Sequence, residues 1–180
     1  MKLKESISLI PVGPVEQTIL EYIQQKLSTI LNTEVFIRPM HILPSGIFDT
    51  RRNQYDIRAV LKLLHDFEDT SGYKIGYINE DCYEDGSEYV LGESVLKGEE
   101  LVIALPRLNL IDGNTDRTIF LNRVLKETLH ELGHSLGLLH CPHGYCVMHN
   151  SATLHRKEVD LANPYCGRCE ELLIQSDSTF

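Results

Sequence analysis

The sequence lacks any hydrophobic run long enough to cross a membrane, and it has no low-complexity tract or internal repeat. A membrane-spanning helix needs about 20 apolar residues, so we expect no membrane partner. The start, MKLKESISLIPVG, also lacks an export signal, because its apolar run is short and ends at Pro11. We therefore expect a cytoplasmic protein, whose cysteines stay reduced unless they bind metal or do redox chemistry.

Positive charge is also scarce in this sequence. The chain has 26 acidic and 17 basic residues, which give a net charge of −9. Proteins that bind nucleic acid usually carry an excess of Lys and Arg, so no nucleic-acid partner is expected. With 180 residues, 42% of them hydrophobic and 24% charged, the composition is that of a single globular domain.

Hydrophobic periodicity predicts alternating strands and helices as far as residue 136. The predicted strands span residues 6–12, 34–38, 73–78, 89–95 and 101–105. The predicted helices span residues 15–30, 54–67 and 116–136. Residues 41–52 are expected to form a loop and residues 81–86 an acidic turn. This order predicts an α/β fold with a mainly parallel sheet, in which residues 89–95 form an irregular edge strand.

The last predicted helix, with Asn114 or Thr115 as its N-cap, carries a stripe of apolar residues that faces a core. Its apolar positions include Phe120, Leu121, Val124, Leu125 and Leu129. From Gly137 onward Gly, Pro, His and Cys become frequent and apolar stripes are short. That C-terminal segment therefore needs something other than a hydrophobic core to hold it.

Histidines on this helix have the spacing of metal ligands. His130 and His134 are four residues apart, so they project from one face of a helix. Glu131 lies about 100° round the helix from His130 and can take a proton from a water molecule that the metal activates. Gly137 can adopt a positive φ, which ends the helix and lets His140 return as a third ligand. Three neutral histidines leave zinc one open position, as in catalytic sites.

Ordinary surface histidines and a solvated glutamate are the alternative to a metal site. The full pattern from His130 to His140 arises by chance in roughly 1 in 10,000 chains of this composition. It also follows directly on the amphipathic stripe, which places it on a true helix. We therefore predict that the three histidines bind metal.

Four of the five cysteines follow the third histidine. Cys166 and Cys169 form a Cys-x-x-Cys pair, and Cys141 and Cys146 form a looser pair; four thiolates would complete a closed, structural zinc site. Such a site would also stabilise the C-terminal segment. Two disulfides or a redox-active pair are the alternatives. Cys82 stands apart and is expected to be an ordinary small residue, buried or partly buried.

Met148 and three further histidines complete the group of notable residues. A lone methionine usually fills a core, but beneath three histidine ligands it can form the floor of a metal site. His143, His149 and His155 are surplus to the metal sites. We expect them on loops or at the surface, where one could hydrogen-bond either the substrate or the residues around the metal.

The whole pattern resembles the metzincins, a clan of zinc proteases. The run His130-Glu131-x-x-His134-x-x-Gly137-x-x-His140 matches their consensus, and Met148 has the place of their Met-turn methionine. The continuation Cys-x4-Cys-x-Met-x17-Cys-x-x-Cys, which begins at residue 141, is similar to the archaemetzincins in particular. Asn150 stands where some metzincins carry a metal-binding tyrosine, which argues against a tyrosine switch.

This resemblance implies a metzincin-like zincin fold, with the sheet packed on two helices and an antiparallel edge strand above the cleft. It also implies a catalytic zinc, a structural zinc and a peptide substrate that pairs with residues 89–95. We accordingly expect one metalloprotease domain over residues 1–180. Its parts would be an α/β subdomain at 1–137 with the active-site helix, and a C-terminal subdomain at 138–180.

The predicted activity is metal-assisted peptide hydrolysis, with Glu131 as the general base. The resemblance hints at small peptides, trimmed from the amino end. Two other functions are compatible with the residues. A non-catalytic zinc module could use both sites to build a binding surface, although such a module has no need of Glu131. A metal or redox sensor could be built on the cysteines.

Overall fold

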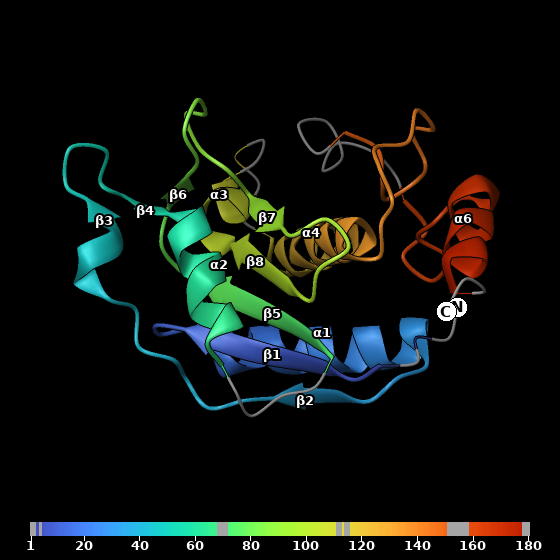
Figure 1. Ribbon diagram of the computed structural model, residues 1–180, viewed down its shortest axis with the longest axis horizontal. Coiled ribbons are helices and arrows are strands. Elements are labelled where there is room, and N and C mark those ends of the chain that lie inside the picture. Colours follow the sequence, from blue (N-terminus) through green and yellow to red (C-terminus); the bar gives the residue numbers. More distant parts are fainter. Residues whose placement is uncertain are drawn as a thin grey trace.

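The computed structural model describes residues 3, 5–67, 72–110, 113, 116–150 and 159–177. At its centre lies a five-stranded sheet in the order β2-β1-β5-β8-β7 (Figure 1). These strands are β1 (Ile7–Val12), β2 (Val35–Ile37), β5 (Tyr73–Ile78), β7 (Gly92–Ser94) and β8 (Glu100–Ala104). All neighbours pair in parallel except β7 and β8, which are antiparallel. The predicted sheet, with its antiparallel edge strand, is confirmed.

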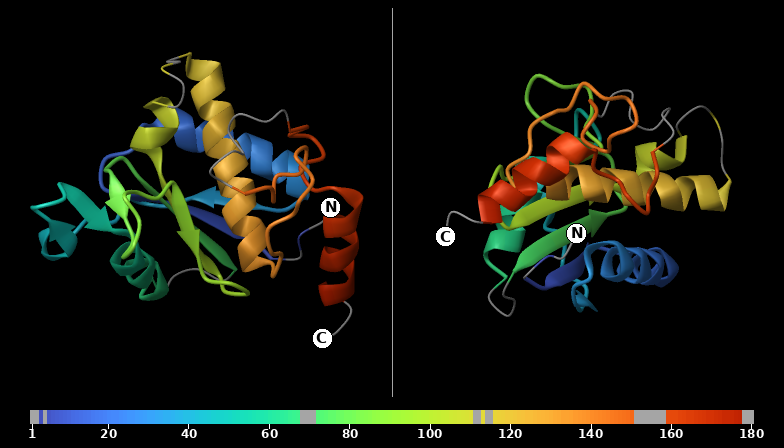
Figure 2. Two further views of the ribbon diagram at one scale, coloured as in Figure 1. Left: turned by 90° about the horizontal axis from the view of Figure 1, so that it is seen from above. Right: turned by 90° about the vertical axis from the view of Figure 1, so that its right-hand side faces the viewer.

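Helices cover both faces of this sheet (Figure 2). The helices are α1 (Gln17–Leu31), α2 (Ile57–His65) and α4 (Arg117–Ser135). Leu9 and Ile75 pack in one core with α1 and α4, whereas Ile10 and Val102 pack in a second core with α2. Every residue of β1 is buried, because a central strand between two helical layers needs apolar side chains on both faces.

A second, smaller sheet was not predicted. Its strands are β3 (Phe48–Asp49), β4 (Gln54–Asp56) and β6 (Cys82–Tyr83), in the order β3-β4-β6. It is preceded by a 3-10 turn, η1 (Ser45–Ile47). The predicted loop at 41–52 and turn at 81–86 were therefore wrong in part. Strands of two or three residues are too short to show the alternation by which a strand is recognised.

The three predicted helices lie within a few residues of their predicted bounds, and capping residues set the starts of α2 and α4. α2 begins at Ile57 rather than at residue 54, because Asp56 ends β4 and its side chain accepts hydrogen bonds from the N–H groups of Arg58 and Ala59. In α4 the N-cap is Asp116, whose carboxylate accepts from the N–H groups of Thr118 and Ile119. The predicted caps, Asn114 and Thr115, lie outside the described residues.

Two further helices follow the central strands. α3 (Leu105–Leu110) continues directly from β8, and α6 (Gly167–Asp177) ends the described chain. The C-terminal residues Cys146, Met148 and Leu173 share the first core with Leu129 of α4. No helix within the described ranges is long and apolar enough to cross a membrane.

Candidate active site and metal centres

The three histidines predicted as ligands converge at the C-terminal end of α4. The Nε2 atoms of His130 and His134 lie 3.1 Å apart. His140 joins them from the following loop, and one ring nitrogen from each histidine lies within 4.8 Å of the others. Nδ1 of His130 is 2.7 Å from the carbonyl oxygen of Val147, and Nδ1 of His134 is 2.8 Å from that of Leu138. These carbonyls hold each Nδ1 as the donor and leave Nε2 free to bind a cation.

The turn after α4 brings His140 back to the helix. Gly137 has a φ of 94°, as its position in the motif predicted. The N–H of Gly137 donates to the His134 carbonyl, and the N–H of Leu138 donates to the Gly133 carbonyl, each at 2.8 Å. This pair of bonds is the Schellman motif, which ends a helix and reverses the chain.

Burial favours the neutral imidazoles of His130 and His134. Only 1% of His130 is exposed, and this burial lowers its pKa to about 4. The pKa of His134 is lowered for the same reason. A neutral imidazole keeps the lone pair that a metal ion requires, so both residues can bind zinc through a ring nitrogen, and His140 offers a third ring nitrogen beside them.

Glu131 lies on the same helix, packed against the edge strand β7. Its carboxylate oxygen Oε2 accepts a hydrogen bond of 2.5 Å from the Ser94 hydroxyl. The pKa of Glu131 is raised to about 8, mainly by burial and to a smaller extent by the nearby carboxylate of Glu127. A dication at the histidines would favour the ionised form, so a buried carboxylate at this place can act as a base.

Met148 lies directly against α4. A Cβ added at Gly133 would lie only 2.2 Å from the Met148 sulfur, so the glycine is what allows this contact. The chain turns here, with the His149 N–H donating to the Cys146 carbonyl. Met148 is fully buried. It therefore packs against α4 at Gly133, which lies between His130 and His134 in the sequence, and its role as the floor of the site stays a prediction.

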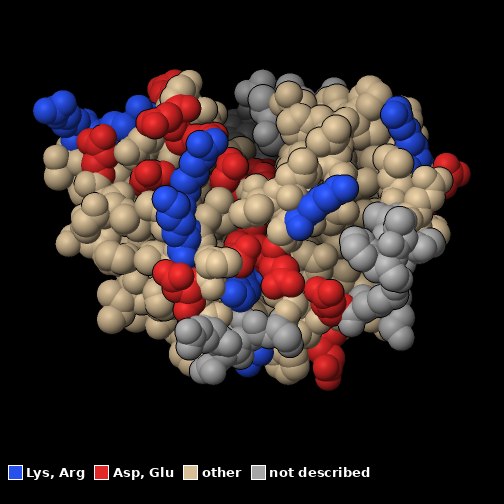
Figure 3. Space-filling view, viewed as in Figure 1, with Lys and Arg blue, Asp and Glu red and all other residues tan. Residues whose placement is uncertain are grey.

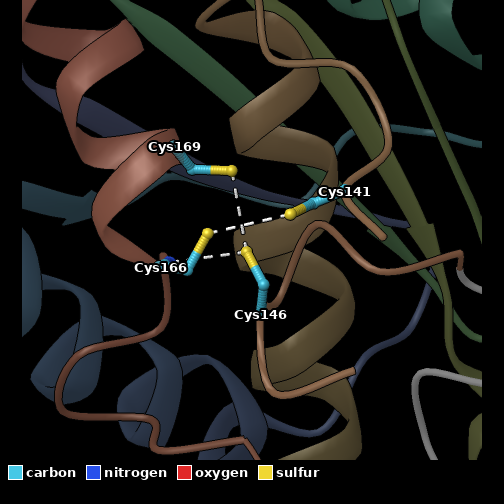
Figure 4. A group of neighbouring side chains, drawn as sticks. All are labelled: Cys141, Cys146, Cys166 and Cys169. Carbon is cyan, nitrogen blue, oxygen red and sulfur yellow. Dashed lines mark hydrogen bonds between the residues drawn. The ribbon is translucent and has the colours of Figure 1, made fainter. Parts of the chain in front are cut away.

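The four cysteines form a second cluster (Figure 4). Cys141 and Cys146 come from the loop after α4, and Cys166 and Cys169 from the start of α6. Their sulfur atoms all lie within 4.8 Å of one another, and all four residues are buried. The pairs Cys141–Cys166 and Cys146–Cys169 are each 3.7 Å apart, far beyond a disulfide bond of about 2.05 Å. The four thiols are therefore free, and the structure does not support the alternative of two disulfides.

This donor set fits a tetrahedral zinc site. Burial raises the pKa of Cys146 and of Cys169. Four buried thiolates would repel one another unless a cation lay among them, and zinc accepts four sulfur ligands.

Two surplus histidines contact the cysteine cluster. Nδ1 of His143 lies 3.4 Å from the Cys166 sulfur, and Nδ1 of His149 lies 3.2 Å from the Cys141 carbonyl oxygen. Both lie on loops, as predicted. Cys82 is fully buried in the core around α2. The remaining surplus histidine, His155, lies outside the described residues.

Three residues at the site were not predicted from the sequence, namely Gly92, Ser94 and Gly133. Gly92 and Ser94 contact Glu131 from β7. Because β7 is distant from Glu131 along the chain, no local motif marks these two residues. Gly133 lies inside the histidine motif, where its lack of a side chain could have indicated a close contact.

Comparison with known proteins agrees with this geometry. The model of peptidase family M54 matches residues 15–175. The archaemetzincin of Methanopyrus kandleri is 35% identical over 161 residues, 89% of this chain and 89% of that protein. The chain belongs to the archaemetzincins, peptidase family M54. The archaemetzincin of Methanocaldococcus jannaschii is 34% identical over 170 residues, 91% of this chain and 89% of that protein.

Solved archaemetzincin structures share the fold. The crystal structure from Methanopyrus kandleri has a TM-score of 0.81 and 28% identity, and covers 97% of this chain and 96% of that one. The structure from Archaeoglobus fulgidus, complexed with malonate, has a TM-score of 0.78 and 29% identity, over 92% of this chain and 98% of that one. As a member of this family, the chain is a zinc metallopeptidase. Family membership favours this function over the non-catalytic zinc module.

Proposed function

We propose that the chain hydrolyses peptide bonds at a zinc ion bound by His130, His134 and His140, with Glu131 as the general base. The convergence of three imidazoles, two of them on α4, beside the buried carboxylate of Glu131 carries this proposal. Zinc held by these histidines would polarise the peptide carbonyl and make a water molecule more acidic.

Glu131 moves the protons in this mechanism. Its carboxylate accepts a proton from the attacking water and then delivers that proton to the leaving amine. Burial raises the basicity of Glu131, which helps the first step, and the same proton is then held close to the departing nitrogen. The N–H···O bonds at Nδ1 keep the rings of His130 and His134 in place throughout.

The four cysteines complete the proposal as the ligands of a second, structural zinc. Cys141 is joined directly to His140, and its N–H donates to the Met148 carbonyl at 2.7 Å. The cysteine cluster therefore holds both ends of the loop that lies under α4, including the methionine that we assign to a Met-turn. The thiols must stay reduced for this role, so a reducing compartment such as the cytoplasm is part of the proposal.

The proposed substrate is a short, extended peptide, trimmed from its amino end. Within the described chain β7 is paired only with β8, so its other edge offers free N–H and C=O groups to such a peptide. Only Gly92–Ser94 form this strand, which limits the length of peptide that pairs. Acidic side chains are frequent on the face that carries β7 and α2 (Figure 3), and they favour a positively charged amino group.

A peptide-cleavage assay tests this proposal. Wild-type protein should cleave short peptides, and a chelator should abolish the cleavage. The variant Glu131→Gln should keep its zinc and lose about 100-fold or more in kcat, because a positioned base contributes about that much. Acetylating the amino end should block cleavage if the amino group is recognised. A Glu131→Gln protein that cleaves at the wild-type rate would contradict the role of Glu131, and equal cleavage of acetylated peptides would contradict amino-end trimming.

A further inference from the structure

The edge strand β7 contacts the general base at two points. Ser94 donates its hydroxyl hydrogen to Oε2 of Glu131 at 2.5 Å. In the described part of the chain, the other oxygen, Oε1, has no hydrogen-bond partner. A carboxylate held by one oxygen has a fixed orientation and keeps the second oxygen available to accept a proton.

Gly92 provides the second contact. A Cβ at this position would lie 2.9 Å from Cγ of Glu131 and 3.1 Å from the Val102 carbonyl oxygen on β8. The aliphatic part of the Glu131 side chain therefore packs directly on the Gly92 backbone. A residue with a Cβ at position 92 would not allow so close a contact. Because Gly92 and Ser94 are two residues apart on a strand, they face the same side, toward α4.

The pairing of β7 links this contact to the substrate. Ser94 pairs with Leu101 and Gly92 pairs with Ile103, so β8 fixes the position of both residues relative to the sheet. The opposite edge of β7 is where we place the peptide. The edge of β7 would then pair with the peptide, while the face of β7 that carries Gly92 and Ser94 contacts Glu131.

We propose that Ser94 is a positioning residue for peptide hydrolysis: its hydroxyl holds Oε2 of Glu131 so that Oε1 faces the water between the base and the three histidines. Gly92 makes this possible by leaving room for the stem of Glu131. This inference rests on the proposed function, since it takes Glu131 as the base. A purely structural role, in which Ser94 only satisfies a buried carboxylate, is the alternative that the experiments must separate.

Steady-state kinetics of three Ser94 proteins test the positioning role. Ser94→Ala should lower kcat by between about 10- and 100-fold, the effect of losing one hydrogen bond to a charged group, and should leave KM within about twofold. Ser94→Thr keeps the hydroxyl and should restore most of kcat. Zinc content per chain should be unchanged in both variants. The matched control is Ser28→Ala on α1, where the exposed hydroxyl donates to the Gln25 carbonyl; this variant should behave as wild type.

A double-mutant cycle shows whether Ser94 acts through Glu131. In a Glu131→Gln background the base is already lost, so adding Ser94→Ala should cause no further fall in kcat. An equal fall in both backgrounds would overturn the proposal. So would a Ser94→Ala protein with wild-type kcat, or a threonine variant as impaired as the alanine variant.

The crystal structure of Ser94→Ala gives a readout that does not depend on turnover. The Glu131 carboxylate should rotate away from the orientation it has in the wild-type protein. If the wild-type protein cleaves no peptide, the proposed function fails, and this structure still decides whether Ser94 orients Glu131. An unchanged carboxylate would overturn the inference while leaving the proposed function intact.

A glycine substitution tests the second contact independently. Gly92→Ala should displace Glu131 and lower kcat at constant zinc content, because the Val102 carbonyl prevents the strand from moving away. Gly46→Ala is the matched control, since a Cβ there would meet no atom within 4 Å. If Gly92→Ala and Gly46→Ala have the same kcat, the packing of Glu131 on β7 does not position it.

Discussion

At the scale of single residues, the site depends on a carboxylate that the fold has buried. Glu131 is 7% exposed and lies near the carboxylate of Glu127, one helical turn earlier. Both burial and that neighbouring charge oppose ionisation, whereas the Ser94 hydroxyl favours it. Without a metal ion, Glu131 in the folded chain therefore keeps its proton to a higher pH than it does in the unfolded chain.

The pH dependence of stability should show this cost. The pKa of Glu131 rises from an ordinary 4.5 to about 8 in the fold, so its contribution to stability is complete below pH 4.5 and is lost as the pH rises toward 8. The glutamine in Glu131→Gln cannot ionise. The free energy of unfolding of the metal-free variant should therefore exceed that of metal-free wild type by roughly a few kcal/mol at pH 8, and the two should match near pH 4.5.

Urea unfolding of both metal-free proteins across this pH range measures the difference. Burial of His130 acts in the opposite direction, since its lowered pKa costs stability as the pH falls below its ordinary 6.5. Both proteins contain His130, so its effect cancels in the comparison. A difference that does not grow between pH 4.5 and pH 8 would show that Glu131 is not buried as described.

At the scale of secondary-structure elements, the end of α4 places the third histidine. The Schellman motif needs a residue with positive φ at position 137. The stem of Lys97, on the turn between β7 and β8, packs over this glycine, and the Lys97 N–H donates to the His134 carbonyl at 3.2 Å. The turn between β7 and β8 thus contacts the end of α4 at the point where the chain leaves the helix toward His140.

Gly137→Ala should disturb this element. A Cβ there would require an unfavourable φ and would lie 3.1 Å from Cε of Lys97. We expect a loss of about 1–2 kcal/mol in the free energy of unfolding and weaker zinc binding at the histidines. Thermal unfolding and competitive zinc titration would measure both effects, with Gly46→Ala as the control. Wild-type zinc affinity in Gly137→Ala would show that the turn does not place His140.

At the scale of the whole molecule, the two ligand clusters share one short segment. Residues 140 to 148 run from the third histidine through two cysteines to Met148, and the Val147 carbonyl binds His130. The cysteine cluster also joins this loop to α6. Loss of the cysteine site should therefore displace residues 140 to 148 and weaken zinc binding at the histidines.

Cys141→Ser tests this coupling. We expect the variant to lose zinc from the cysteine cluster and also to lower the zinc occupancy of the histidine site, because His140 is no longer anchored by its neighbour. Metal analysis by mass spectrometry would count zinc per chain. The control is Cys82→Ala, which removes a buried thiol from the other core and should leave the zinc content unchanged. Undiminished zinc at the histidines of Cys141→Ser would refute the coupling.

Much of the site could be predicted from the sequence alone because its geometry is local. The spacing of His130, Glu131 and His134 needs only the period of a helix, and the positive φ of Gly137 follows from its lack of a side chain. The order of apolar runs likewise indicated the mainly parallel sheet. The four cysteines from 141 to 169 indicated a metal cluster, and the structure brings their thiols together.

Only the tertiary structure decided how the base is held. Ser94 and Gly92 reach Glu131 because β8 positions β7 against α4, and a contact across such a distance along the chain has no local signal. The small sheet of β3, β4 and β6 is another such feature, since its strands exist through pairing rather than through their own periodicity. The sequence by itself therefore determined which side chains carry the chemistry. Packing between distant segments decided how Glu131 is oriented and how far its carboxylate is removed from water.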